Sequence, residues 1–98
     1  MNSNNLKTQK NEILISFKKK KFEKVITDGK MLLEERQNDA QLIYLIGLSL
    51  INLQDFIQAE KFFEKLIFLN KNSENLYTLG NIQKKLKKFY DAISSFEE

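Results

Sequence analysis

The sequence of 98 residues contains no cysteine, histidine, tryptophan or proline, and only three glycines. Without cysteine no disulfide can form, and without cysteine and histidine the usual zinc ligands are missing. The same two absences exclude the nucleophile–histidine pairs of serine and cysteine hydrolases. We therefore expect a chain that is not an enzyme and that binds no metal or cofactor.

Charge is nearly balanced along this chain. It has 16 Lys and Arg against 13 Asp and Glu, a formal net charge of +3. This permits weak attraction to anionic partners but is far below the basic excess of a dedicated nucleic-acid surface. The longest uncharged stretch, residues 40–54, is shorter than the roughly 20 residues a membrane-spanning helix needs. Since the polar amino terminus also lacks the apolar core of a secretory signal, the sequence predicts a cytoplasmic protein without a membrane segment.

A pattern of glycine, aromatic and alanine residues occurs twice with a displacement of 33 residues. A fixed period of this size indicates a repeated supersecondary unit. The four displaced pairs are Gly47 and Gly80, Phe56 and Phe89, Ala59 and Ala92, and Phe63 and Phe96.

Each unit is predicted to contain two helices. Apolar residues surround the segment 42–53 and form a helical stripe over 56–69, while polar residues cluster at 52–55 and 70–73. Ser73 is a plausible N-cap for the next helix. Because these turns are short, successive helices should be antiparallel neighbours.

The small residues predict close approach within each helix pair. Gly47 and Ala59 are expected to face one another on neighbouring helices, and Gly80 and Ala92 repeat the relation. Missing side-chain bulk at a crossing allows helix axes to come nearer. The aromatic residues would then fill the surrounding volume.

At these residues the sequence resembles the tetratricopeptide repeat family, whose pattern is a large apolar residue, Leu-Gly, an aromatic, an alanine and a second aromatic. The resemblance covers residues 40–98. Ile43 stands in place of the family's tryptophan or tyrosine, Lys71 in place of its proline, and Gln83 in place of an apolar residue. The resemblance implies an all-α fold, an α-solenoid of antiparallel helix pairs in a right-handed superhelical array.

A weaker copy of the pattern precedes these two repeats. Phe22 and Val25 lie 34 residues before Phe56 and Ala59, but the glycine and second aromatic are replaced by Ile13 and Gly29. Terminal repeats are commonly atypical, because only one side is packed. The first helix, from about residue 6, could be shifted by one residue. We expect a chain cut from something longer, because the last repeat stops within its second helix. The predicted divisions are a disordered segment 1–5, a capping repeat 6–39, a repeat 40–72 and an incomplete repeat 73–98.

The resemblance also implies a concave groove lined by the first helix of each repeat, where family members hold a segment of a partner protein. Tyr44 and Tyr77 are the best anchors, since tyrosine combines contact area with a hydroxyl group. The alternative is that both tyrosines only pack between neighbouring helices. Gln41 and Glu74 occupy further concave positions. The predicted groove residues are Lys10, Leu14, Phe17, Tyr44, Leu48, Ile51, Asn52, Tyr77, Asn81 and Lys84.

One specificity of the family, the carboxylate clamp for acidic chaperone tails, does not fit this sequence. Of its five positions only Lys10 agrees, while the others hold Leu14, Leu45, Glu74 and Thr78. These four residues would not supply the donors that a buried carboxylate needs. No chaperone-tail partner is therefore expected.

Two lysine runs, at residues 18–21 and 84–88, occupy the same place in the first and third repeats. Both are predicted to form the turn between the two helices of a repeat and to project from one edge of the array. An edge of this kind could attract phosphate, nucleic acid or an acidic partner. We favour solvated turns, and we expect no specific nucleic-acid partner.

Two classes of function follow. The first is a non-catalytic protein–protein interaction module that binds a partner segment in its groove. The second is an amino-terminal recognition or oligomerisation module of a larger bacterial enzyme, since similar repeats precede glycosyltransferase and sulfotransferase domains. Self-association is also expected through the last helix, which should expose Ile93 and Phe96.

Overall fold

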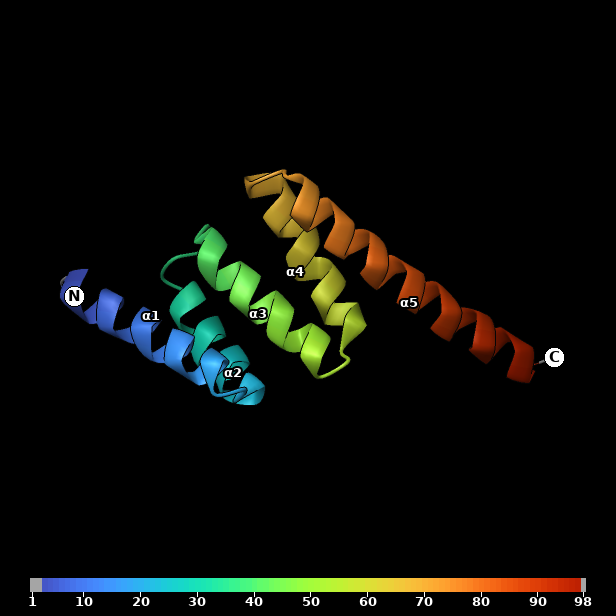
Figure 1. Ribbon diagram of the computed structural model, residues 1–98, viewed down its shortest axis with the longest axis horizontal. Helices are drawn as coiled ribbons and strands as arrows, with labels where there is room; N and C mark the ends of the chain where they lie inside the picture. Colours follow the sequence, from blue (N-terminus) through green and yellow to red (C-terminus); the bar gives the residue numbers. More distant parts are fainter. Residues whose placement is uncertain (1–2, 98) are drawn as a thin grey trace.

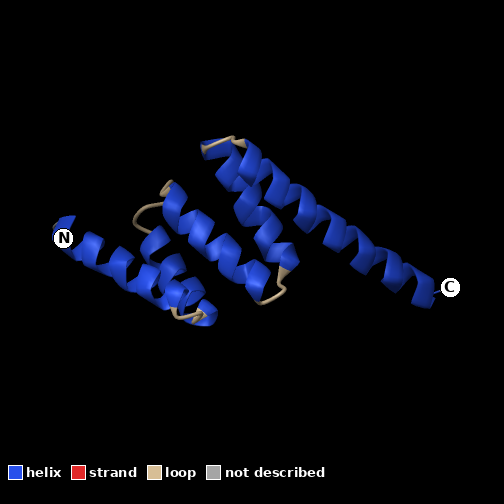
Figure 2. Ribbon diagram, in the orientation of Figure 1, coloured by secondary structure: helices blue, strands red, loops and turns tan. Residues whose placement is uncertain are grey.

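The computed structural model describes the backbone of residues 3–97 and the side chains of residues 7–93. This part of the chain is entirely helical apart from its turns, as the sequence predicts (Figure 2). Each helix packs against the next along the chain, giving an elongated array of 56 × 26 × 21 Å (Figure 1). The helices are α1 (Ser3–Lys18), α2 (Phe22–Leu33), α3 (Ala40–Asn52), α4 (Phe56–Leu69) and α5 (Ser73–Glu97).

Side-chain oxygens cap the first turns of three helices. Asp39 and Asp55 accept hydrogen bonds from the backbone N–H three residues on, at 3.2 Å in both cases. Asn72 does the same at 2.8 Å, so the cap of α5 is Asn72 and not the predicted Ser73, which is the first helical residue. A cap of this kind satisfies one of the backbone donors left free at a helix start.

The amino terminus is more helical than the sequence predicts. We expected a disordered segment 1–5, but α1 begins at Ser3; residues 1 and 2 lie outside the described part. Over residues 3–97, no helix combines the length and the apolar character that crossing a bilayer requires.

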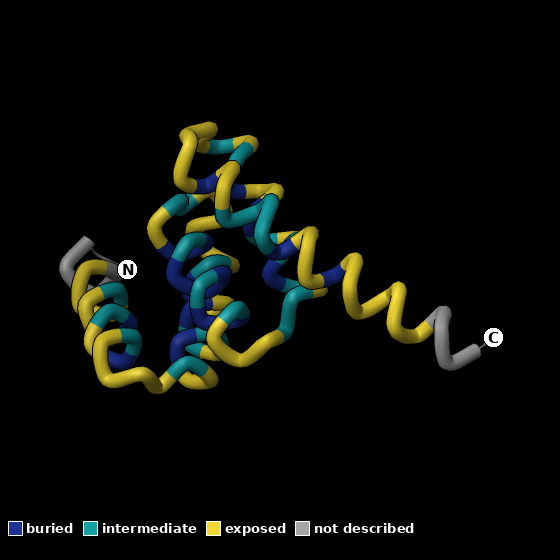
Figure 3. Tube along the Cα trace, turned by 45° about the vertical axis from the view of Figure 1, so that its right-hand side comes forward, coloured by how far each residue is buried: buried dark blue, intermediate teal, exposed yellow. Residues whose placement is uncertain are grey.

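The core is continuous from α1 to the first half of α5 and is centred on α3 (Figure 3). One cluster of buried residues joins α3, α4 and α5, and a second joins α1, α2 and α3. Ile43, Ile46 and Phe63 are fully buried. Burial of each such side chain contributes about 1.5–3 kcal/mol relative to an exposed one.

Two glycines mark close contacts between neighbouring helices. A Cβ at Gly47 would lie 2.7 Å from Cε2 of Phe63, and one at Gly29 would lie 2.8 Å from Cγ1 of Ile46. Real Cβ atoms do not approach other atoms so closely, because interiors are already close-packed. The close approach predicted for Gly47 is therefore present, although Phe63 rather than Ala59 supplies the nearest atom.

The third repeat departs from the prediction, because α5 runs without a break through residues 84–88. The predicted turn, and the pairing of Gly80 with Ala92 across it, are wrong; both residues lie on one helix. Asp55, which caps α4, corresponds after 33 residues to Lys88, which has no acceptor for a backbone N–H. Gln54 in the left-handed region, with φ at 63°, corresponds to Lys87. With the cap lost and good helix formers present, the helix continues.

The continuous helix leaves exposed the positions that the second repeat buries. Ile43 is fully buried, whereas its counterpart Leu76 is 43% exposed. Ala59 is also fully buried, but Ala92 is exposed. Ile93 is exposed as predicted, and the side chain of Phe96 lies outside the described residues. Residues 40–69 therefore form the one closed helix pair of the two that the period of 33 predicts.

The two repeated glycines should respond to alanine with opposite signs. Gly47→Ala forces a methyl group against Phe63, and overpacking of about 1–3 kcal/mol outweighs the roughly 1 kcal/mol gain in helix propensity. A Cβ at Gly80 would meet no atom within 4 Å, so Gly80→Ala should raise the free energy of unfolding by about 0.5–1 kcal/mol. Urea denaturation followed by circular dichroism measures both. Equal effects at the two sites would contradict the packing described.

Candidate partner-binding site

The predicted groove residues lie on α1, α3 and α5, which run in the same direction along the array (Figure 1). Polar contacts connect the beginnings of these helices. Lys10 Nζ of α1 donates to Asp39 Oδ2 at 2.9 Å, and the Tyr44 hydroxyl of α3 donates to Glu74 Oε1 of α5 at 3.2 Å. The two contacts place the first helices of successive units beside one another.

A recess of about 290 Å³ lies where α3 and α5 begin and α4 ends. Tyr44 and Gln41 contribute from α3, and Glu74 contributes from the first turn of α5. The end of α4 and the following turn supply Leu66, Asn70 and Asn72. The recess therefore joins residues of two repeats that the sequence mapped to the concave side.

The two tyrosines have different surroundings. The ring of Tyr44 is half-buried and meets Phe63 edge to face, with centroids 6.1 Å apart. Burial raises the pKa of Tyr44, and the charge of Glu74 and the hydrogen bond to it act in the same direction. Tyr77, by contrast, is 73% exposed. Packing between helices therefore describes Tyr44, while Tyr77 offers its ring to solvent.

The remaining groove residues are held by their own neighbours. On α1, Leu14 and Phe17 are half-buried and pack against the cluster that joins α1, α2 and α3. On α3, Leu48 and Ile51 pack against the central cluster, and Asn52 donates to the Leu48 carbonyl at 2.8 Å. On α5, Asn81 is half-buried and Lys84 is exposed.

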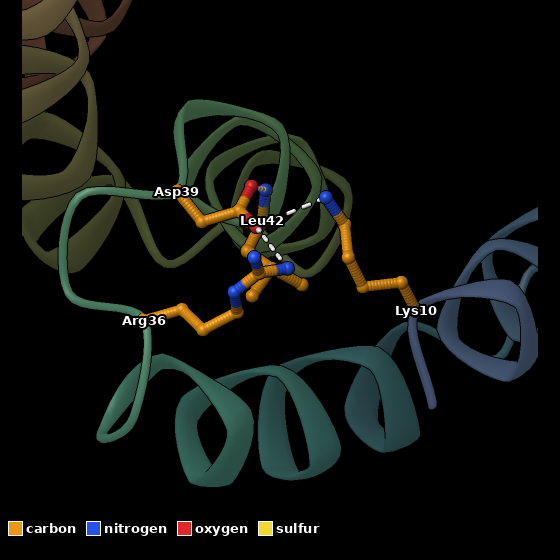
Figure 4. Close-up of polar contacts among 4 residues, drawn as sticks. All are labelled: Lys10, Arg36, Asp39 and Leu42. Carbon is orange, nitrogen blue, oxygen red and sulfur yellow. Dashed lines mark hydrogen bonds and ion pairs between the residues drawn. The ribbon is translucent and has the colours of Figure 1, made fainter. Parts of the chain in front are cut away.

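Lys10 holds a structural position (Figure 4). Its ammonium group reaches the carboxylate of Asp39, which also lies 3.8 Å from Arg36 Nη1 and caps α3 at Leu42. Burial raises the pKa of Asp39, but the hydrogen bonds from Lys10 and Leu42 and the charges of Lys10 and Arg36 outweigh it, so this pKa lies below its ordinary value. Lys10 therefore fixes α1 to the start of α3.

The basic segments do not form matching turns at one edge. Residues 18–21 join α1 to α2, as predicted, with Lys20 at φ 61°. Residues 84–88 lie within α5, where Lys85 Nζ sits 5.3 Å from the centroid of Phe56. The expectation of two basic turns projecting together is therefore wrong.

Sequence reasoning missed two parts of the surface. Asn75 is buried and its side-chain amide donates to the Asn70 carbonyl at 3.1 Å, which shapes the α4–α5 turn beside the recess. A second recess, of about 320 Å³, lies between α1 and α2 with Glu12 and Asp28 in its lining. Its residues come from two helices and share no motif that could have marked them. Among the side chains the structure describes, no three acidic residues are grouped so that they could hold a metal ion.

Comparison with known families agrees with the helix pairs described. The model of the tetratricopeptide repeat matches residues 40–73 and 73–98. No curated relative matches the sequence. The matched boundaries fall at the start of α3 and the start of α5.

Stability should depend on pH through Asp39. Because its pKa is lowered by folding, the ionised carboxylate stabilises the fold above the unfolded pKa, and this contribution is lost as the pH falls through the folded pKa. Asp39→Asn keeps an acceptor for Leu42 but removes the ion pair, so it should lower the free energy of unfolding at pH 7 by about 0.5–1.5 kcal/mol.

The difference between Asp39→Asn and the unmodified chain should shrink on acidification, as measured by urea denaturation between pH 7 and pH 3. Lys10→Met is the matched variant, because it removes the same ion pair from the other side. A constant difference at every pH would contradict the role given to this carboxylate.

Proposed function

Because the chain belongs to the tetratricopeptide repeat family, we propose that it is a non-catalytic protein–protein interaction module that holds a segment of a partner protein along α1, α3 and α5. Repeats of this family generally mediate contacts between proteins. The observation that supports this location best is the recess at Tyr44 and Glu74, with the exposed ring of Tyr77 beside it on α5. The same binding role applies whether the chain acts alone or as a module of a larger enzyme.

The chemistry of the recess favours a partner segment that brings hydrogen-bond donors. Glu74 presents a carboxylate, and Gln41 and Asn72 present amides. A buried acceptor without a donor is costly, so a partner with a basic or amide side chain complements this end of the groove. A terminal carboxylate does not, because it would lie beside Glu74.

Tyr77 offers the anchor for such a segment. Its ring is exposed before binding, and aromatic residues at the centre of an interface often account for 2 kcal/mol or more of the binding free energy. Tyr44 supports the recess from below, since its hydroxyl is already bonded to Glu74. The two tyrosines thus have separate tasks in one site.

The proposal is tested with peptides selected from a random library on the 98-residue chain. Tyr77→Ala should weaken a selected peptide by about tenfold or more, the loss that corresponds to roughly 1.4 kcal/mol. Isothermal titration calorimetry measures the affinity. The matched control is Phe68→Ala, which removes another exposed ring, on α4 and outside the recess lining.

Unchanged affinity of Tyr77→Ala, or an equal loss in Phe68→Ala, would place the binding surface elsewhere. Circular dichroism of each variant separates a lost contact from a lost fold. Glu74→Gln adds a second readout, because it should reduce the preference for peptides with a basic side chain while leaving the anchor intact.

A further inference from the structure

The apolar residues of α5 form one seam along the helix. Leu79, Ile82, Leu86, Phe89 and Ile93 follow one another at spacings of three and four residues. This alternation is the pattern by which two helices pack along their length in a coiled coil. A seam of this kind requires a neighbouring helix over its whole extent.

Only the first half of the seam has a neighbour. Ile82 and Leu86 are 2% and 8% exposed because α4 covers them. Phe89 and Ile93 are 54% and 39% exposed. The rings of Phe89 and Tyr90 contact one another at 5.6 Å and form an aromatic surface on the uncovered part.

The boundary lies where α4 begins. Phe56 is the first residue of α4 and its ring lies beneath Lys85, one residue before Leu86 on α5. The chain then turns back through residues 53–55 to α3, while α5 extends away from the array (Figures 1 and 3). The same seam thus passes from a formed interface to solvent within one helical turn.

We propose that residues 86–93 of α5 pair with the same segment of a second copy of this chain, antiparallel and about a two-fold axis. This surface lies outside the groove proposed for partner segments and does not depend on it. In such a pair Phe89 of each copy packs against Ile93 of the other. The interface between α4 and α5 is thereby continued by a helix of the second copy.

The distribution of charge on α5 favours a second copy as the occupant. Near the axis of a two-fold pair, a flanking residue meets its own counterpart, so a charge there repels itself. The residues flanking the uncovered part of the seam are Tyr90 and Ala92, both uncharged. At 3.6 residues per turn, the charged Lys84, Lys87 and Asp91 fall on the far side of the helix.

The short overlap sets the strength of the pair. Residues 86–93 make little more than two helical turns, far less than the contact area of a permanent dimer. Association should therefore be weak and should reverse on dilution. Sedimentation velocity of the full chain over a wide concentration range measures this equilibrium.

Charge placed on the seam should weaken the dimer. Phe89→Glu and Ile93→Glu each put two carboxylates at the centre of the pair, and each should raise the dissociation constant at least about tenfold. Both side chains are exposed in the single chain, so helicity measured by circular dichroism should be retained. Tyr77→Glu is the matched control, since it alters an exposed aromatic residue of the same helix off the seam.

A chain that stays monomeric at the highest concentration would overturn the proposal. So would a dimer unaffected by Phe89→Glu and Ile93→Glu, or one lost equally in Tyr77→Glu. That last result would place the contact between copies on the groove instead.

Direction is tested with a spin label, because the chain has no cysteine of its own. In the antiparallel pair, Tyr77→Cys carries labels at opposite ends, about 40 Å apart from the 1.5 Å rise per residue. Double electron–electron resonance measures this distance. A parallel pair would bring the two labels within about 20 Å and would overturn the antiparallel arrangement.

Discussion

The contact between the backbone of α3 at Gly47 and the ring of Phe63 sets the spacing of the central helix pair. Because no side chain separates them, the fully buried ring fills the space between α3 and α4 and also supports the edge of Tyr44. Tyr44 in turn reaches Glu74 at the start of α5. The position of the recess therefore follows from one missing side chain in the core.

The spacing of residues predicts the second repeat well, since its glycine, alanine and aromatic residues pack within a single helix pair. The continuous α5 was not predicted from the same spacing. Whether a helix ends depends on a few capping atoms, and Lys88 cannot supply what Asp55 supplies. A pattern of apolar positions contains no information about that difference.

The candidate site was predicted in outline, because the groove positions do fall on α1, α3 and α5. Their separate roles could not be read from the sequence. Tyr44 and Tyr77 occupy equivalent repeat positions, yet only Tyr44 has a neighbour on each side. Lys10 was assigned to a partner, but its ion pair with Asp39 joins residues 29 apart, a relation that only the folded chain creates.

That ion pair couples the stabilities of adjacent units. Asp39 begins α3, and a residue of α1 holds its carboxylate in place. In a linear array, stability is the sum of each unit's own contribution and its contacts with nearest neighbours. The first unit, which has the weakest repeat pattern, therefore takes part in nucleating the second, and the two should unfold in a single cooperative transition.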